Sequence, residues 1–275
     1  MSDVTIVVAT RDRAAELRRS LARHTAPVIV VDNASRDDTA EVARRAGARV
    51  VRLPGNRGAA ARNVGVREAP TRYVAFADDD SWWAPGALEH AAAVMDAHPR
   101  TALVAARVLV GEREHLEPVS ELMARSPLGI PDGLPGRAIL GFLACSAVVR
   151  RDAFLQVGGF SGTLHFAGEE ELLALDLAAA GWGLAYLPEL VVHHHPSPHR
   201  AAARDRRRRE ARNRVLTAWL RRPLPTFLRT ALASLATAEG RGGLADAVRA
   251  WPEVARARRP LPPDVERARA ALDGR

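Results

Sequence analysis

Short apolar runs alternate with helix-like segments at the start of the chain, and this alternation limits the possible folds more than any other feature. Residues 4–9, 28–31 and 49–53 have the length and apolar character of buried strands, and segments with helical spacing at 14–24 and 35–46 separate them. Strands joined through helices pair in parallel, because a parallel crossover needs a long connection. The pattern predicts an α/β fold with a doubly wound, mostly parallel sheet flanked by helices.

The rest of the chain continues this pattern less regularly. Ser35 with Asp38 resembles a capping box and predicts the start of the second helix. Residues 111–137 are rich in glycine, proline and charge and lack a clear period, so we expect a long, partly irregular surface segment that shapes a substrate site. Further elements are expected as follows: helices at 85–98 and 151–157, and strands at 73–77, 101–110 and 139–150.

Three consecutive carboxylates follow the apolar run Tyr73–Ala77. Asp78, Asp79 and Asp80 repel one another, so folding alone gives no reason to place them together at a strand end. One interpretation is a solvated acidic turn before a helix that starts at Pro85. The other is a divalent-cation site, since hard cations prefer oxygen ligands and ligands bind at the carboxyl ends of strands in such sheets.

Three other polar clusters have the same two kinds of interpretation. Glu169, Glu170 and Glu171 open a helix, where the helix dipole stabilises acids, although a cap does not need three. The histidines at 193–195 follow a strand. They are either part of a solvated loop or ligands of a metal or phosphate. Small residues surround two arginines in the segment 56–65, which suits either approach of an anion or close helix packing.

The basic excess belongs to the last part of the chain. Of the net charge of +8, residues 199–275 contribute +11, from 19 arginines against 8 acidic residues, so residues 1–198 carry −3. Residues 215–235 combine Trp, Phe and Leu at helical spacing with nearby arginines. These helices either pack on the preceding domain or bind an anionic membrane surface. Nucleic acid is not expected, because stacking aromatic residues are not interleaved with the arginines.

Other features limit the compartment. The single cysteine, Cys145, excludes an internal disulfide and fits a reducing environment. Residues 1–9 lack the basic segment and cleavage site of a signal peptide. We therefore expect a cytoplasmic protein, peripheral at the inner face of the membrane if the last helices bind lipid.

Several short motifs occur together in a recognisable order. The motifs are Thr10-Arg11, Val31-Asp32-Asn33, Asn56–Asn63, Asp78-Asp79-Asp80, Gly158-Gly159-Phe160, Glu169-Glu170, and Pro188 followed by His194. In this order and spacing they resemble the inverting family 2 glycosyltransferases, over about residues 4–197. The resemblance implies the GT-A fold and a metal-dependent, hexosyltransferase-type reaction that uses a UDP- or dTDP-linked sugar.

The resemblance also implies a division of the chain. Residues 1–198 would form the catalytic domain, with a nucleotide-sugar half at about 1–110 and an acceptor half at about 111–198. Residues 199–275 would form an arginine-rich helical extension. The acceptor would be a glycan, a lipid-linked saccharide or a natural product.

On the donor side, the resemblance assigns the nucleotide base pocket to Thr10, Arg11 and Asp32. It assigns a base or diphosphate contact to Arg62 and a ribose or sugar contact to Asp79, the middle residue of the DXD element.

For the metal and the chemistry, the resemblance implies that Asp78 and Asp80 hold a Mn or Mg ion that bridges the diphosphate, with His194 beside it. Glu170 takes the position of the general base, with Glu169 and Glu171 as neighbouring alternatives. Leu172 stands where many relatives have an aspartate, so acceptor contacts there are expected to differ.

Two other functions compete with this one. A sugar-1-phosphate nucleotidyltransferase would need a glycine-rich, lysine-containing loop near the N-terminus, and the chain contains no lysine. A non-catalytic nucleotide-sugar-binding or membrane-associated scaffold would be favoured by a broken acidic cluster, and both clusters are intact.

Overall fold

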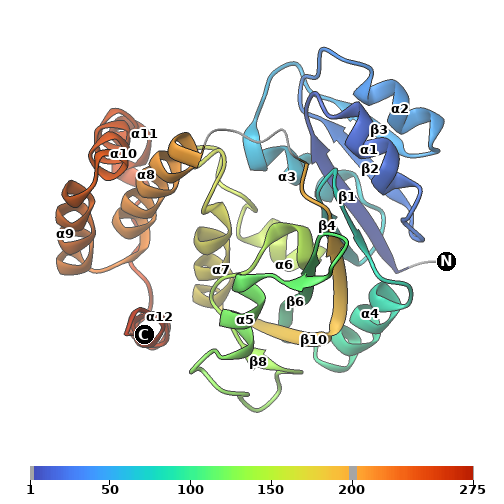
Figure 1. Ribbon diagram of the computed structural model, residues 1–275. Coiled ribbons are helices and arrows are strands. Elements are labelled where there is room, and N and C mark those ends of the chain that lie inside the picture. The colour runs from blue at the N-terminus through green and yellow to red at the C-terminus, as the bar shows by residue number, and fades with distance from the viewer. Residues whose placement is uncertain (1–2, 198–202, 275) are drawn as a thin grey trace.

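One mixed sheet organises the first part of the chain, in the strand order β3-β2-β1-β4-β9-β6-β10-β5 (Figure 1). The computed structural model describes residues 3–197 and 203–274. The strands are β1 Val4–Thr10, β2 Val28–Asp32, β3 Arg49–Arg52, β4 Tyr73–Ala77, β5 Ser81–Trp83, β6 Thr101–Val110, β7 His115–Leu116, β8 Arg137–Ala138, β9 Ala147–Arg150 and β10 Gly183–His194. The expected α/β class and doubly wound sheet are confirmed.

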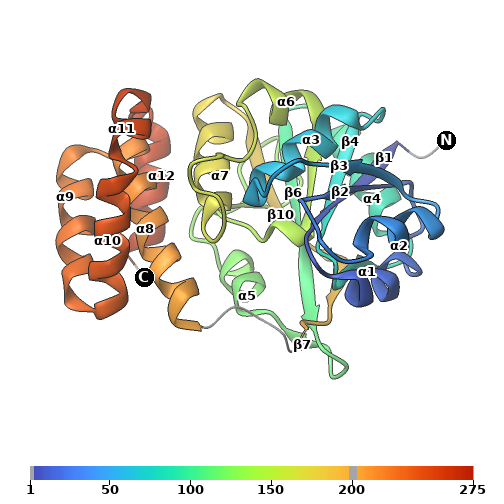
Figure 2. The same cartoon turned by 90° about the horizontal axis from the view of Figure 1, so that it is seen from above.

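Helices cover both faces of this sheet and form a separate group after it (Figure 2). The α-helices are α1 Ala14–Leu21, α2 Thr39–Arg45, α3 Ala61–Glu68, α4 Ala87–Ala97, α5 Pro118–Ala124, α6 Arg151–Gln156, α7 Glu169–Ala179, α8 Ala203–Arg221, α9 Leu224–Ala233, α10 Ala238–Arg249, α11 Trp251–Val254 and α12 Pro263–Asp273. Four short 3-10 turns are η1 Gly58–Ala60, η2 Ala144–Ser146, η3 Ser234–Ala236 and η4 Ala255–Ala257.

The direction of the strands brings the functional strand ends to one edge. β3, β2, β1 and β4 are parallel neighbours, whereas β9 runs antiparallel between β4 and β6. β6 and β10 are parallel, so β10 points the same way as β4. The carboxyl ends of β1, β2, β4 and β10 therefore share the edge at which open α/β sheets bind ligands.

The strands form because they can bury apolar side chains on both faces of the sheet. Every residue of β4 is buried, and the two largest apolar clusters of the described residues lie on opposite faces of the sheet. Gly65 lets α3 lie directly on the sheet, because a Cβ there would be 2.4 Å from a methyl carbon of Val7. This close packing fixes the start of α3 next to the end of β4.

The ladder between β10 and β6 is interrupted after Leu187. Leu187 pairs with Ala106 of β6, and the next paired residue of β10 is Val191, opposite Arg107. Three residues, 188–190, therefore bulge out of the ladder, and the last strand segment, Val191–His194, re-enters in a new register.

The last helices share a core with α7. Leu164 and Leu172 pack with Val215, Leu216 and Leu220 of α8. A second cluster joins Leu140 and Leu175 to Leu261 and Val265 near α12. Figures 1 and 2 both show α7 between the sheet and the helices α8–α12. The interpretation in which these helices pack on the preceding domain is confirmed, and the expected domain boundary at 198/199 lies outside the described residues.

Two local expectations were wrong, and the partly irregular segment 111–137 includes one helix. α2 begins at Thr39 and not at Ser35, whose hydroxyl instead accepts a hydrogen bond from the amide of Asp12. The segment 111–137 contains α5, which starts after Glu117 because that side chain accepts the amide N–H of Val119. The expected strand 139–150 is regular only from Ala147, because residues 144–146 form a 3-10 turn.

Candidate active site

The acidic triplet lies in a turn between β4 and β5. The amide of Asp78 donates a 2.8 Å hydrogen bond to the hydroxyl of Ser81, and Ser81 begins β5. β5 pairs with the end of β10, where Ser81 stands opposite His194. The turn therefore lies at the ligand-binding edge of the sheet, next to the histidine run.

Asp79 is held from the end of β1. Its carboxylate accepts hydrogen bonds from the Thr10 hydroxyl at 2.6 Å and from Nε of Arg13 at 3.1 Å. Burial raises the pKa of Asp79 to about 6, although Thr10 and Arg13 act in the opposite direction. Thr10, which the resemblance assigns to the nucleotide base pocket, thus bonds directly to the middle residue of the triplet.

Asp80 has several donors around it. Nε2 of His194 lies 3.2 Å from one carboxylate oxygen, and Nη2 of Arg13 and the amide of Ser197 lie 3.3 and 3.2 Å from the other. Burial acts to raise the pKa of Asp80, but the His194 hydrogen bond and charge, with Ser197 and Arg13, hold it below its usual value. Asp80 is thus an ionised, well-oriented carboxylate.

Asp78, Asp80 and His194 form a group that could hold a metal ion. Each offers one ligand atom, and the three atoms lie within 4.8 Å of one another. The other two histidines point elsewhere: the His193 ring stacks on Trp82 and bonds to Glu114, and the His195 ring also contacts Trp82. Two oxygens and an imidazole are a suitable partial ligand set for Mn²⁺ and an acceptable one for Mg²⁺.

Arg62 connects the two acidic clusters. Its Nη2 donates a 2.7 Å hydrogen bond to Asp78, and its Nη1 lies 4.0 Å from an oxygen of Glu169. Arg62 is only 5% exposed and Glu169 only 1%. The two groups of carboxylates therefore converge at one place in the structure, on opposite sides of one guanidinium.

Two buried polar atoms at this junction lack a partner among the described residues. They are Nε of Arg62 and Oε2 of Glu169. Buried polar groups in folded proteins are normally hydrogen-bonded, so such a pair at one junction indicates a position where a ligand supplies the missing partners.

The three glutamates at the start of α7 differ in their surroundings. Burial and repulsion from Glu170 raise the pKa of Glu169, and burial likewise raises that of Glu170. Both carboxylates interact with Arg62 and Asp78. Glu171 instead faces α12, where Arg269 donates to it at 2.7 Å. Glu169 and Glu170 belong to the site, and Glu171 belongs to the contact between α7 and the last helices.

The other donor-side residues of the prediction lie farther out. Arg11 is exposed and pairs with its neighbour Asp12. Asp32 is fully buried at the end of β2, where it accepts the amide of Ser35 and Nε of Arg52, each at 2.9 Å. Both stand at the ligand-binding edge, but among the described residues neither bonds to the acidic triplet.

Sequence reasoning missed Arg13. This residue pairs with Asp79 and Asp80 and is the main cation on that side of the triplet. The sequence did contain a hint of this contact. Arg13 follows the end of β1, and β1 pairs in parallel with β4, so residues just after these two strands lie close together. The expected grouping used only the first arginine after the strand, Arg11.

The loop before α7 is clamped on two sides. From the donor half, the amide of Ala59 donates to the carbonyl of His165 at 2.5 Å, and a Cβ on Gly58 would lie 2.1 Å from that same oxygen. From α8, the side-chain Nδ2 of Asn213 donates to the carbonyls of Leu164, Phe166 and Ala167 at 2.9, 3.0 and 2.7 Å. This clamp sets where α7 begins.

The balance of charge favours an added cation. Asp78, Asp79, Asp80, Glu169 and Glu170 bring five carboxylates together, and Arg13 and Arg62 bring two guanidinium groups. A divalent cation lowers the repulsion that remains. The arrangement can bind a cation with an anionic ligand and take a proton from a group placed beside α7.

Comparisons with known proteins agree with this geometry. A family model described as "Glycosyl transferase family 2" matches residues 5–158. A pre-mycofactocin glycosyltransferase from Mycobacterium tuberculosis (strain CDC 1551 / Oshkosh) is 34% identical over 218 residues, which cover 74% of this chain and 44% of that protein. The same protein from strain H37Rv matches equally. The chain thus spans less than half the length of these curated relatives.

Solved structures share the fold at low sequence identity. A mannosyltransferase from Pyrobaculum calidifontis, in complex with GDP-Man and Mn²⁺, has a TM-score of 0.61 at 19% identity, covering 99% of this chain and 86% of that chain. Residues 1–349 of S. aureus TarS, in complex with UDP-GlcNAc, have a TM-score of 0.57 at 18% identity, covering 90% and 72%.

Proposed function

Because the chain belongs to glycosyltransferase family 2, we propose that it transfers a sugar from a nucleoside-diphosphate sugar to an acceptor hydroxyl, with inversion at the anomeric carbon. The observation that carries this proposal is the junction at Arg62, where the acidic triplet and the glutamates of α7 meet. One cluster would serve the donor and the other the acceptor.

We assign the donor side to the ends of β1, β2 and β4. Asp78, Asp80 and His194 fit a divalent cation by ligand type and spacing. When bound, such a cation supplies positive charge opposite the diphosphate that leaves. Thr10 and Arg13 hold Asp79 in place to contact the ribose or sugar, and Arg62 with its unpartnered Nε meets the diphosphate.

The nucleotide base contacts would come from Arg11 and Asp32. Asp32 already bonds to Arg52 and Ser35, so it would take part by fixing the floor of the pocket. Two of the similar structures hold a guanosine and a uridine nucleotide sugar. We propose a UDP- or dTDP-linked donor and use GDP-linked donors as the comparison in the test below.

The acceptor side belongs to α7. A hydroxyl is a weak nucleophile, so a carboxylate within hydrogen-bond reach takes its proton as it attacks the anomeric carbon. We assign this role to Glu170, with Glu169 next to it. A raised pKa makes either glutamate a stronger base once it is ionised, and Arg62 favours that ionised form. A base on the face opposite the leaving group gives inversion, as in inverting hydrolases.

A donor panel tests the proposal. Purified protein is incubated with UDP-, dTDP- and GDP-sugars, with Mn²⁺ or Mg²⁺ or with EDTA, and release of the nucleoside diphosphate is measured with and without acceptors. The acceptor set includes saccharides, lipid-linked saccharides, natural products and, because of the name of the curated relatives, pre-mycofactocin. We expect one donor to be hydrolysed and transferred in a metal-dependent way, with an inverted product by NMR. Metal-dependent thermal stabilisation by UDP without turnover of any donor would indicate a binding scaffold instead.

A further inference from the structure

The helix α9 carries a row of exposed leucines that its own folding does not require. Leu224, Leu228, Leu232 and, just beyond it, Leu235 are 53, 55, 67 and 47% exposed. Their spacing of four, four and three residues places them on one face. An exposed apolar face of this kind lowers solubility and promotes aggregation. Its presence therefore indicates a surface that binds a partner.

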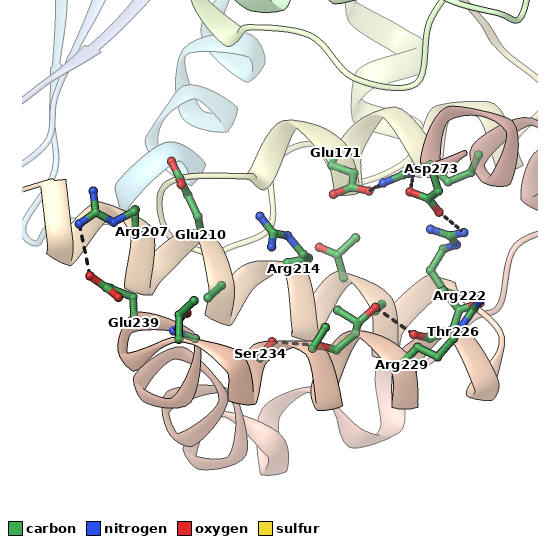
Figure 3. A pocket seen from close by; sticks show the side chains of 18 residues that line it. Glu171, Arg207, Glu210, Arg214, Arg222, Thr226, Arg229, Ser234, Glu239 and Asp273 are labelled. Atoms are coloured by element: carbon green, nitrogen blue, oxygen red, sulfur yellow. Dashed lines mark hydrogen bonds and ion pairs between the residues drawn. The ribbon is translucent and has the colours of Figure 1, made fainter. Parts of the chain in front are cut away.

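The other sides of α9 are already used. Phe227 packs against Trp219 and Trp251, with ring centroids 5.4 and 6.0 Å away. Thr226, Arg229 and Ser234 line a polar groove of about 670 Å³ between α7, α8, α9 and α12 (Figure 3). The helix is therefore anchored on two sides, and the exposed leucines lie on the remaining one. α9 itself lies at the outer edge of the helical group (Figure 1).

The surroundings of this face are basic. Residues 211–238 contain five arginines and no aspartate or glutamate. Arg229 follows Leu228 directly and is exposed, although it also lines the groove. Arg241 is exposed too and donates a 2.9 Å hydrogen bond to the carbonyl of Leu235, at the end of the row. Within residues 3–197 and 203–274, neither Arg229 nor Arg241 has an ion pair with an acidic side chain.

We propose that this leucine face of α9 docks on an anionic lipid surface, with Arg229 and Arg241 at the level of the headgroups. An amphipathic helix with an apolar face and basic flanks lies in the plane of the interface. A bilayer that contains anionic lipid offers both the apolar layer and the opposite charge. A second copy of the chain offers an apolar face but no opposite charge, because a symmetric contact would place the same arginines against one another. No helix of the described residues is long and apolar enough to cross a bilayer.

Vesicle sedimentation tests the surface. The full chain is mixed with vesicles of phosphatidylcholine alone or with 30% phosphatidylglycerol. We expect binding to the anionic vesicles, at least tenfold weaker binding for Leu228→Glu with Leu232→Glu, and a reduced preference for anionic lipid for Arg229→Gln with Arg241→Gln. Ile130→Glu is the matched control, since Ile130 is 64% exposed but belongs to the first part of the chain.

Three outcomes would overturn this proposal. The wild type could fail to bind either vesicle, the Ile130 variant could lose as much binding as the leucine variant, or the leucine variant could abolish a dimer seen by light scattering in the absence of lipid. The last result would assign the face to a second copy. Circular dichroism melts of each variant show whether it is folded before binding is compared.

A separate observation concerns Asn213 of α8. Asn213 is 1% exposed, its amide nitrogen donates to three carbonyls of the loop 164–167, and its oxygen accepts Nη1 of Arg212 at 2.7 Å. The loop has left-handed backbone at His165 and Ala167, with φ of 62 and 72°, as well as at Gly168. Non-glycine residues hold such conformations only where their surroundings fix them.

We infer that Asn213 is a positioning residue for the glutamates of α7, an inference that rests on the proposed function. Glu169 follows Gly168 directly, so a shift of the clamped loop moves the first turn of α7. The base must lie within hydrogen-bond reach of the acceptor, and small displacements cost much rate. The arginine-rich extension would then help to build the active site.

The test compares Asn213→Ala with Thr217→Val. Thr217 is one turn along α8, is 3% exposed, and its hydroxyl has no hydrogen-bond partner among the described residues, so valine removes no bond. For Asn213→Ala we expect kcat to fall at least tenfold with donor Kd unchanged, and faster hydrogen exchange at amides 163–170. Thr217→Val should change none of these.

Unchanged kcat and exchange in Asn213→Ala would refute the positioning role while the wild type still transfers sugar. A wild type that turns over no donor would instead refute the proposed function, and hydrogen exchange would still report on the clamp. If Asn213→Ala does not fold, Asn213→Gln is used, and full activity together with wild-type exchange in that variant, despite its longer side chain, would also count against the inference.

Discussion

The acidic triplet after β4 and the glutamates of α7 face each other across Arg62, yet the two clusters differ in the cations and hydrogen-bond donors around them. Asp79 and Asp80 have Arg13, and Asp80 also has His194 and an amide donor. Glu169 is buried and Glu170 is half-buried, Arg62 is their shared cation, and the pKa values of both are raised. In the first cluster Asp80 is held ionised by its donors, whereas burial raises the pKa of Asp79 to about 6. The glutamates of α7 are arranged to exchange a proton. This difference predicts how variants on the two sides should fail.

The largest effect is expected at the donor side. Asp80→Ala removes a carboxylate that His194, Arg13 and Ser197 orient, so transfer should fall by about 10³-fold or more, with weaker metal-dependent binding of the nucleotide. Turnover and calorimetric titration with UDP and Mn²⁺ measure the two effects. Asp152→Ala, with a 91% exposed side chain, should change neither. An active Asp80→Ala enzyme would show that the metal site lies elsewhere.

The second prediction separates chemistry from binding. Glu170→Gln keeps the size of the side chain but cannot accept a proton, so kcat should drop by about 10²–10⁴-fold while donor Kd stays within about twofold. Glu169→Gln should have the smaller effect on kcat. If the order of the two variants is reversed, the base is Glu169.

Arg62 offers a way to disturb both clusters at once. Arg62→Gln removes the 2.7 Å bond to Asp78 and should cost about 1.5–3 kcal/mol of unfolding free energy. Arg62 lowers the pKa of both glutamates, so its loss raises their pKa further, and the acid limb of the pH–rate profile should move to higher pH. Arg67→Gln on the exposed side of α3 is the control. An unmoved acid limb would mean that neither glutamate is the group that titrates.

The smallest effect is expected at Glu171. Its carboxylate is bonded to Arg269 of α12, so Glu171→Gln should lower the unfolding free energy by about 1 kcal/mol or less and leave kcat within about twofold. Chemical denaturation and initial rates measure these quantities. A loss of turnover comparable with that of Glu170→Gln would contradict the separation of the three glutamates.

Much of this site could be predicted from the sequence, for a physical reason. Asp78–Asp80 follow a buried strand and Glu169–Glu171 open a helix, so their positions along the chain already fix which edge of the sheet they reach. The three consecutive histidines at 193–195 were less informative, because the sequence alone does not say which of them faces the sheet edge.

What escaped prediction depends on contacts between distant segments. Arg13 acts on a carboxylate 66 residues away, and Asn213 acts on a loop 46 to 49 residues away. Leu172, read as a departure in acceptor contacts, instead packs with Val215 and Leu216 of α8. The local sequence pattern predicts that a strand or helix forms, but it does not say which distant segment packs against it. Contacts with such segments therefore cannot be read from the pattern.

The bulge in β10 has a consequence for which imidazole meets Asp80. Side chains alternate along a strand, so the number of residues looped out at 188–190 decides whether an even or an odd position turns toward the acidic side. If one residue before the histidines were deleted and the bulge kept its length, the strand would slip by one residue and His195 would take the position of His194. Because the chain has three histidines in a row, such a slip would still leave an imidazole there, so the run gives the ligand position a tolerance to length changes in the loop before it.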